Sequence, residues 1–135
     1  MIARSRPLVL VADDEPDIRG LLSRTLERAG YQVISAGDGD EAFDLALEHL
    51  PALAVIDVVM PGRSGLELVR DLRRRAVTRS MPIILTSAHV READLQLGHA
   101  AGADRYVTKP LSPRELITCV EGLLETGRRE ALSTT

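Results

Sequence analysis

The feature that most constrains the fold is an alternation of short apolar runs with longer segments whose apolar residues recur at helical spacing. Apolar runs bounded by turn residues are typical of strands. The five expected strands are Leu8–Ala12, Gln32–Ala36, Leu53–Asp57, Ile83–Ser87 and Arg105–Thr108. Strands that alternate with helices form a parallel sheet with right-handed crossovers and helices on both faces. We therefore expect an α/β domain, a doubly wound five-stranded parallel sheet of the flavodoxin-like (βα)5 kind with strand order 2-1-3-4-5.

Start and stop residues bound the five expected helices. Proline suits the first helical position, glycine favours a helix end, and Ser or Asp caps a helix start. The helices should run from Pro16 to Ala29, from Asp38 or Asp40 to Leu50, from Gly65 past Leu72, from about Arg91 to Ala101, and from Pro113 to Leu124. Periodicity places Ile18, Leu21, Leu22, Leu26 and Ala29 on the inner face of the first helix, and Ala93, Leu97, Ala100 and Ala101 on that of the fourth. Leu95 then points outward, as an isolated surface residue or as a partner contact.

The length bounds the number of domains, because 135 residues suffice for about one domain with a single core. We divide the chain into an N-terminal extension (1–7), one domain (8–126) and a polar, frayed tail or linker stub (127–135). Hydrophobic residues make up 44% and charged residues 27%, as in an ordinary soluble globule. The chain has one Phe, two Tyr and no Trp, so the core must be aliphatic.

Charge and cysteine content exclude several classes of function. A net charge of −3 gives no electrostatic footprint for nucleic acid. The cluster of arginines at residues 70–79 is interpreted as a solvated helix end, where cations are favourable; it comprises Arg70, Arg73, Arg74, Arg75 and Arg79. The single Cys119 allows no internal disulfide and gives no metal-site spacing. No apolar run approaches ~18 residues. We expect a cytoplasmic protein that binds neither a membrane nor nucleic acid directly.

Polar residues follow or end four of the five expected strands. Asp13 and Asp14 follow the first strand, Asp57 ends the third, Thr86 lies in the fourth and Lys109 follows the fifth. Since the carboxyl ends of parallel strands share one edge of the sheet, these side chains should gather there. Three crowded carboxylates cannot all stay ionised unaided, whereas a divalent cation together with Lys109 would balance them. Oxygen ligands with room for water and phosphate favour Mg²⁺.

Asp57 has two interpretations, because a carboxylate in an apolar strand is costly to bury. One is that it only accepts hydrogen bonds from backbone N–H groups of the following turn. The other is that a carboxylate beside Mg²⁺ and an ammonium group can attack phosphorus, with Thr86 donating a hydrogen bond to a phosphoryl oxygen. The placement of the polar residues at one sheet edge favours the second interpretation.

Four stretches resemble the receiver domains of two-component response regulators. They are Leu10–Glu15, Asp57–Leu68, Pro82–Ala88 and Gly102–Pro110, and the similarity extends from about Leu8 to Leu124. The resemblance implies that Asp57 is phosphorylated by a histidine kinase or a histidine phosphotransfer protein.

The resemblance also implies roles for the residues around the acceptor. Asp14, Asp57 and the backbone carbonyl of Val59 would bind Mg²⁺, with Asp13 assisting, commonly through water. Lys109 would contact the phosphoryl group. The peptide bond that precedes Pro110 would be cis.

A conformational switch is part of the same resemblance. Thr86 would move toward the phosphoryl oxygen and Tyr106 would turn inward, which changes the surface of the fourth helix, fifth strand and fifth helix. A downstream protein effector or a second copy of the chain would bind there. Phosphorylation need only favour one of two existing packings.

Little catalysis of its own is expected from such a domain: self-phosphorylation from small donors and slow self-dephosphorylation. In the family, the second residue after the acceptor and the second after the switch threonine help to set the phosphoryl lifetime. Here they are Val59 and Ala88, and neither side chain can orient an attacking water. We expect a lifetime of minutes to hours.

Two other functions fit the same fold. A flavodoxin-like cofactor binder would need a phosphate-cradling loop after the first strand, where Asp13-Asp14-Glu15 would instead repel phosphate. A phosphohydrolase with an aspartyl nucleophile would need a substrate-binding insertion, for which the short loops leave little room. Within the receiver interpretation, the chain is a free-standing regulator, a relay, or a fragment of a larger DNA-binding regulator, output enzyme or hybrid kinase.

Overall fold

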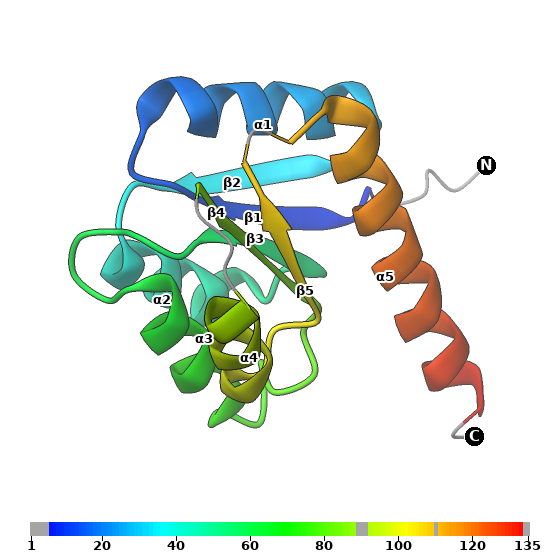
Figure 1. Ribbon diagram of the computed structural model, residues 1–135. Helices are drawn as coiled ribbons and strands as arrows, with labels where there is room; N and C mark the ends of the chain where they lie inside the picture. Colours follow the sequence, from blue (N-terminus) through cyan, green and yellow to red (C-terminus); the bar gives the residue numbers. More distant parts are fainter. Residues whose placement is uncertain (1–5, 89–91, 110, 134–135) are drawn as a thin grey trace.

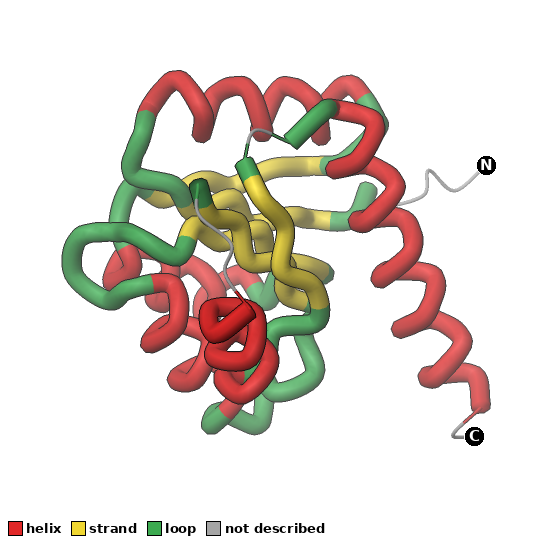
Figure 2. Tube along the Cα trace, viewed as in Figure 1, coloured by secondary structure: helices red, strands yellow, loops and turns green. Residues whose placement is uncertain are grey.

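A computed structural model describes residues 6–88, 92–109 and 111–133 of the chain. It contains a five-stranded parallel sheet in the order β2-β1-β3-β4-β5 (Figures 1 and 2). The strands are β1 (Leu8–Ala12), β2 (Gln32–Ala36), β3 (Leu53–Asp57), β4 (Ile83–Ser87) and β5 (Arg105–Thr108). The helices are α1 (Pro16–Arg28), α2 (Gly39–His49), α3 (Gly65–Arg73), α4 (Glu92–Ala101) and α5 (Pro113–Ser133). The predicted fold class and strand order are confirmed.

Two aliphatic layers enclose the sheet. Helices α1 and α5 cover one face, and α2, α3 and α4 cover the other (Figure 1). Strand β3 is buried throughout, with Ala54 and Ile56 facing the second group of helices and Leu53 and Val55 facing the first. Every residue of β4 is also buried. The central strands therefore behave as fully buried parallel strands, and Asp57 ends one of them.

Side-chain caps fix the starts of α2, α3 and α5. Asp38 caps α2 by accepting a hydrogen bond from the Glu41 N–H at 2.7 Å. Ser64 and Glu67 form a reciprocal capping box at the start of α3. Ser112 accepts from the Glu115 N–H at 3.1 Å at the start of α5, as the sequence predicted.

The predicted inner faces of two helices are partly wrong. On α1, Leu22 and Leu26 are buried, whereas Leu21 and Ala29 are exposed. On α4, Leu97 and Ala100 are exposed while Leu95 is partly buried, and the inner positions are Gly98 and Ala101. The cause on α4 is tertiary, because the Tyr106 ring lies where a β-carbon at residue 98 would be. Helix α4 therefore turns Gly98 toward the sheet to make room for this ring, and Leu97, which periodicity placed on the inner face, is exposed.

Helix α5 is longer than predicted. It continues through Gly127 to Ser133, so residues 127–133, expected as a frayed segment, are helical. The residues that flank Gly127 are mostly good helix formers, and one glycine costs only about 1 kcal/mol in a helix. Within the described ranges, no helix combines the length and the apolar character needed to cross a membrane.

Arg73, expected in a solvated helix end, is instead a largely buried hydrogen-bond donor whose side chain is 19% exposed. Its Nε donates to the Gly102 carbonyl at 2.9 Å and its Nη1 to the Met81 carbonyl at 2.6 Å. Its Nη2 pairs with Asp104 Oδ2 at 3.0 Å, and that oxygen also accepts from the Ile83 N–H at 2.8 Å. Arg73 thus ties the end of α3 to the starts of β4 and β5.

We expect Arg73→Ala to lower the free energy of unfolding by about 2–4 kcal/mol, because it leaves buried carbonyls without a donor. Arg70→Ala is the matched control, since Arg70 lies on the exposed face of the same helix. Its effect should stay within about 0.5 kcal/mol. Urea denaturation of both variants measures the difference, and equal midpoints would contradict the structural role of Arg73.

Candidate functional site

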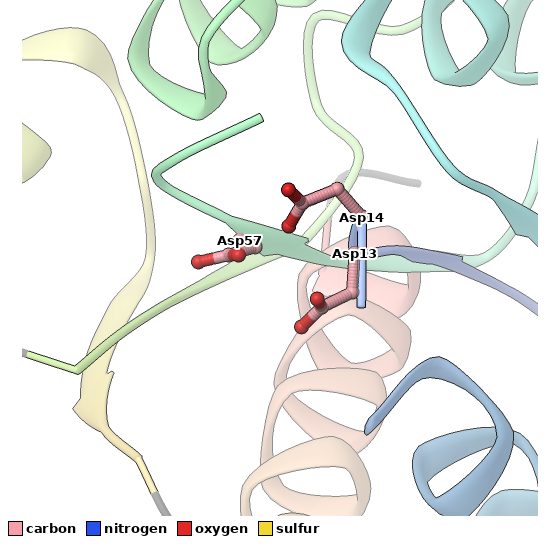
Figure 3. Close-up of side chains that lie close together, drawn as sticks. All are labelled: Asp13, Asp14 and Asp57. Atoms are coloured by element: carbon pink, nitrogen blue, oxygen red, sulfur yellow. The ribbon is translucent and has the colours of Figure 1, made fainter. Parts of the chain in front are cut away.

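The predicted site residues do meet at the carboxyl edge of the sheet. Asp13 and Asp14 follow β1, and Asp57, the last residue of β3, pairs in register with Thr86 of β4. Lys109 follows β5 directly. Figure 3 shows the three carboxylate groups gathered at the ends of β1 and β3. The topology alone brings together residues that are far apart in the sequence.

Lys109 is the positive centre of the site. Its Nζ lies 2.8 Å from Oδ2 of Asp13 and 3.2 Å from Oδ2 of Asp57. Asp13 is 0% exposed and Asp57 is 5% exposed. By contrast, the Val59 N–H lies 3.5 Å from Asp57 Oδ1, at the limit for a hydrogen bond. Asp57 is therefore held mainly by the ammonium group, not by the backbone of the turn.

The three aspartates have the arrangement of a metal site. Asp13, Asp14 and Asp57 each offer one oxygen, and these oxygens lie within 4.8 Å of one another. Asp14 and Asp57 line a cavity of 170 Å³, together with Glu15, Val59, Ser87, Ala88 and Lys109. All the side-chain donors are hard oxygens, and the carboxylates outnumber the one ammonium group. The residues present therefore fit a small divalent cation such as Mg²⁺.

Asp13 and Asp14 differ in how they can serve such an ion. Both oxygens of Asp13 are already engaged, Oδ1 by the Glu15 N–H at 3.0 Å and Oδ2 by Lys109. Asp14 is exposed at the cavity. A water-mediated role suits Asp13, whereas Asp14 is open to direct contact.

The electrostatics reflect an excess of negative charge. Burial raises the pKa of the Asp57 carboxyl, and the neighbouring Asp13 raises it further against the opposing effect of Lys109. Burial alone would lower the pKa of Lys109, but its hydrogen bond to Asp13 and the charge of Asp57 raise that pKa above its ordinary value. Lys109 therefore stays protonated, and the pocket favours additional positive charge.

Of the two predicted switch residues, Thr86 adjoins the pocket, because it pairs in register with Asp57. Thr86 is 1% exposed, and its Oγ1 has no hydrogen-bond partner among the residues described. An unpaired buried hydroxyl costs free energy, so this group is available as a donor. Tyr106 is partly buried and packs against Gly98 of α4. Ala88 is exposed at the rim. Pro110, predicted to follow a cis peptide bond, lies outside the described residues.

Sequence reasoning missed two contributors to the site. Ser87 is buried and lines the cavity beside Thr86, and its place at the end of β4 was the available signal. Arg19 of α1 donates from Nη1 to the Asp13 carbonyl at 2.8 Å, which fixes the end of β1. Nothing in the local sequence distinguishes Arg19 from the exposed arginines of the same helix.

Known proteins are similar to this chain in sequence and fold. A family model described as a response regulator receiver domain matches residues 9–121. The chemotaxis protein CheY4 of Vibrio cholerae is 32% identical, with a TM-score of 0.85 over 88% of this chain and 99% of that chain. A LuxR-family two-component response regulator from Aurantimonas sp. SI85-9A1 is 33% identical, with a TM-score of 0.82 and coverages of 90% and 87%. The signal receiver domain of a signal transduction histidine kinase from Syntrophus aciditrophicus is 31% identical, with a TM-score of 0.83 and coverages of 89% and 91%.

The raised pKa of Asp57 makes a prediction about stability. A carboxyl whose pKa is higher in the folded than in the unfolded state lowers the free energy of unfolding wherever the unfolded carboxyl is ionised, so Asp57 destabilises the metal-free protein at neutral pH. We expect Asp57→Asn to raise the melting temperature there, by roughly 4 °C for each kcal/mol of repulsion relieved. The difference should vanish as the pH falls below about 4, where unfolded aspartate is protonated too.

Thermal melts in the presence of a chelator, taken across this pH range, measure the effect. Asp44→Asn is the control, because Asp44 is exposed on α2 and remote from the cavity residues. A melting temperature at pH 7 that is lower for Asp57→Asn than for the wild type would contradict the prediction.

Proposed function

The chain belongs to the family of response regulator receiver domains of two-component systems, and from that premise we propose that Asp57 is its phospho-acceptor. The observation that carries the proposal is the position of Asp57, buried at the end of β3 beside Lys109 and two other aspartates. The donor would be the phosphohistidine of a histidine kinase or of a phosphotransfer protein. The burial of Asp57 beside only one cation explains why a second positive charge is needed for the reaction.

Mg²⁺ is the cation that we propose for this site. Asp14, Asp57 and the backbone carbonyl of Val59 would hold it, and Asp13 would contribute through water. The ion would neutralise negative charge on the phosphoryl group during its transfer. The oxygen-only donor set and the exposed position of Asp14 support this assignment.

The residues of the chain then have distinct tasks in the transfer. An Oδ atom of Asp57 forms a bond to phosphorus as the P–N bond to the donor imidazole breaks, and the imidazole nitrogen keeps the electron pair of that bond. Lys109, already 3.2 Å from Asp57, would hold its ammonium group against a phosphoryl oxygen. Thr86 would donate its unpaired hydroxyl to another phosphoryl oxygen.

The output would be a change of the surface formed by α4, β5 and α5. Thr86 lies on β4 and Tyr106 on the adjoining strand β5. When Thr86 turns to the phosphoryl group, Tyr106 would take a different position against α4. A downstream protein effector, or a second copy of the chain, would recognise the changed surface. We propose residues 8–126 as the functional domain, acting in the cytoplasm without direct contact with nucleic acid or membranes.

The alternatives are weaker on specific grounds. A flavodoxin-like cofactor binder is disfavoured because Asp13 and Asp14 directly follow β1, where their carboxylates would repel a cofactor phosphate. A phosphohydrolase is disfavoured because the cavity of 170 Å³ is bordered by short loops. The similarity to receivers of a LuxR-family regulator and of a histidine kinase supports the further possibility that the chain is part of a larger regulator or hybrid kinase.

Treatment with acetyl phosphate and Mg²⁺ should add one phosphoryl group, a mass increase of ~80 Da. The adduct should be acid-stable and base-labile, as an acyl phosphate is, and a chelator should prevent its formation. Asp57→Asn should abolish it, whereas the exposed control Asp44→Asn should be modified like the wild type. An adduct that survives in Asp57→Asn would refute the proposed acceptor.

The phosphoryl group should persist for minutes to hours. Val59 is 72% exposed and Ala88 is exposed, and neither side chain has a hydrogen-bonding group that could hold a water against phosphorus. Val59→Asn, which supplies an amide that can orient water, should shorten the half-life by about tenfold. Val77→Asn is the control, because Val77 is similarly exposed but lies in the connection between α3 and β4. A half-life of seconds for the wild-type phosphoprotein would contradict this prediction.

A further inference from the structure

The loop between β3 and α3, residues 58–64, is attached to the neighbouring helices in part through the side chain of Arg63. Its Nε lies 3.5 Å from Oδ1 of Asp40 on α2 and 3.3 Å from Oδ2 of Asp71 on α3. Its guanidinium carbon lies 3.8 Å from the centroid of the Phe43 ring. Phe43 is the only phenylalanine of the chain and is largely buried. Arg63 thus joins the loop to two helices at once.

This contact is more than a surface ion pair. Exposed ion pairs contribute little by themselves, but a partly desolvated guanidinium over an aromatic face is attracted by the ring as well as by the carboxylates. The Nη1 atom of Arg63 is buried without a hydrogen-bond partner in the described part of the chain. Burying that N–H group is unfavourable, so the ring and the two carboxylates must outweigh its cost.

The backbone of the loop also lies close to the first turn of α2. The Gly39 N–H donates to the Pro61 carbonyl at 3.1 Å, and a β-carbon at residue 39 would overlap the Arg63 carbonyl. Gly62 has φ +72°, and a β-carbon there would lie 2.6 Å from Oδ2 of Asp40. Figure 1 shows this loop, in green, arching past α2. Only glycine at both positions allows the approach that brings Arg63 onto Phe43.

The same loop carries Val59, which lines the acidic cavity. Its start is fixed by the sheet, since the Val58 N–H donates to the Thr86 carbonyl at 2.9 Å and the Val58 carbonyl accepts from Gly65 at 2.8 Å. The Val59 side chain is 72% exposed and belongs to neither core cluster, whereas Met60, the next residue, is buried in the cluster on the α2 and α3 side. The Val59 backbone is therefore held between the sheet on one side and the contacts of Met60 and Arg63 on the other.

We infer that Arg63 is a positioning residue for the metal site: it holds the 58–64 loop so that the Val59 carbonyl is presented to Mg²⁺. The inference rests on the proposed function, because it assumes that this site binds Mg²⁺. Arg63 itself touches neither the ion nor the phosphoryl group and acts through the loop.

The test compares two arginines that face the same ring. Arg63→Met removes the charge and the planar group but keeps the apolar stem, and Arg75→Met does the same at a guanidinium 5.4 Å from the Phe43 ring and outside the loop. Titration with Mg²⁺, followed by the amide resonances of Asp14, Asp57 and Val59, gives the dissociation constant in the folded protein. We expect Arg63→Met to raise this constant about tenfold, as the loss of a residue that orients metal ligands typically does.

Two further readouts separate positioning from general stability. In Arg63→Met without metal, the Val59 amide resonance should move more than that of Asp14, which belongs to another element. Arg63→Lys, which keeps the charge without the planar group, should give an intermediate dissociation constant. Arg75→Met should stay within about twofold of the wild type, even if both Met variants melt at similarly lowered temperatures.

The inference would be overturned if the wild type binds Mg²⁺ and both Arg63→Met and Arg75→Met bind it with the same dissociation constant as the wild type. Should Arg63→Met fail to fold, Arg63→Lys replaces it, and a dissociation constant equal to that of the wild type in that variant has the same meaning. A wild type that shows neither Mg²⁺ binding nor Asp57-dependent phosphorylation would refute the proposed function, and the inference with it.

Discussion

The contact between the ammonium group of Lys109 and the buried carboxylates of Asp13 and Asp57 is the interaction on which the site depends. Lys109 and Asp13 are 96 residues apart in the sequence, so their contact can form only when the strands have taken their places in the sheet. The register sets the remaining geometry, because Asp57 pairs with Thr86 and Ser87 with Thr108. The fold thereby places one cation among several anions at a single edge. That imbalance makes the edge receptive to a divalent cation.

The same imbalance conflicts with the rest of the core. Strand β3 is buried along its whole length in aliphatic side chains, and its last residue is a carboxylate whose ionisation the surroundings oppose. Functional sites commonly break the rules that the remainder of a sequence obeys. Here the compensation is visible in the surrounding contacts, since Arg19 fixes the end of β1 and Lys109 neutralises part of the charge. The polar edge is therefore held in place by groups that lie outside the acidic cavity as well as within it.

Local sequence signals sufficed for the strands and for the edge where the site lies. Apolar runs such as Leu53–Asp57 are bounded by turn residues, and alternation with helices then dictates parallel strands whose carboxyl ends coincide. Local sequence signals could not predict contacts between residues that are distant in the sequence. Arg73 looked like a member of an exposed arginine cluster, yet it donates to carbonyls near β4 and β5. Gly98 gave no sign of the Tyr106 ring that lies against it. Gly127 resembled a helix stop, although its neighbours favour continuation of α5.

These long-range contacts also constrain how a change at the acceptor could reach the surface. Arg73 fixes the residues that follow α4, because it donates to the Gly102 carbonyl and pairs with Asp104. Tyr106 lies two residues beyond Asp104 and rests on Gly98, in the middle of the helix. With the end of α4 held and its middle in contact with the ring, a displacement of the ring must be taken up at Gly98 rather than at Gly102. The proposed switch would therefore tilt α4 about its anchored end, because a sliding of the whole helix would break the hydrogen bonds of Arg73.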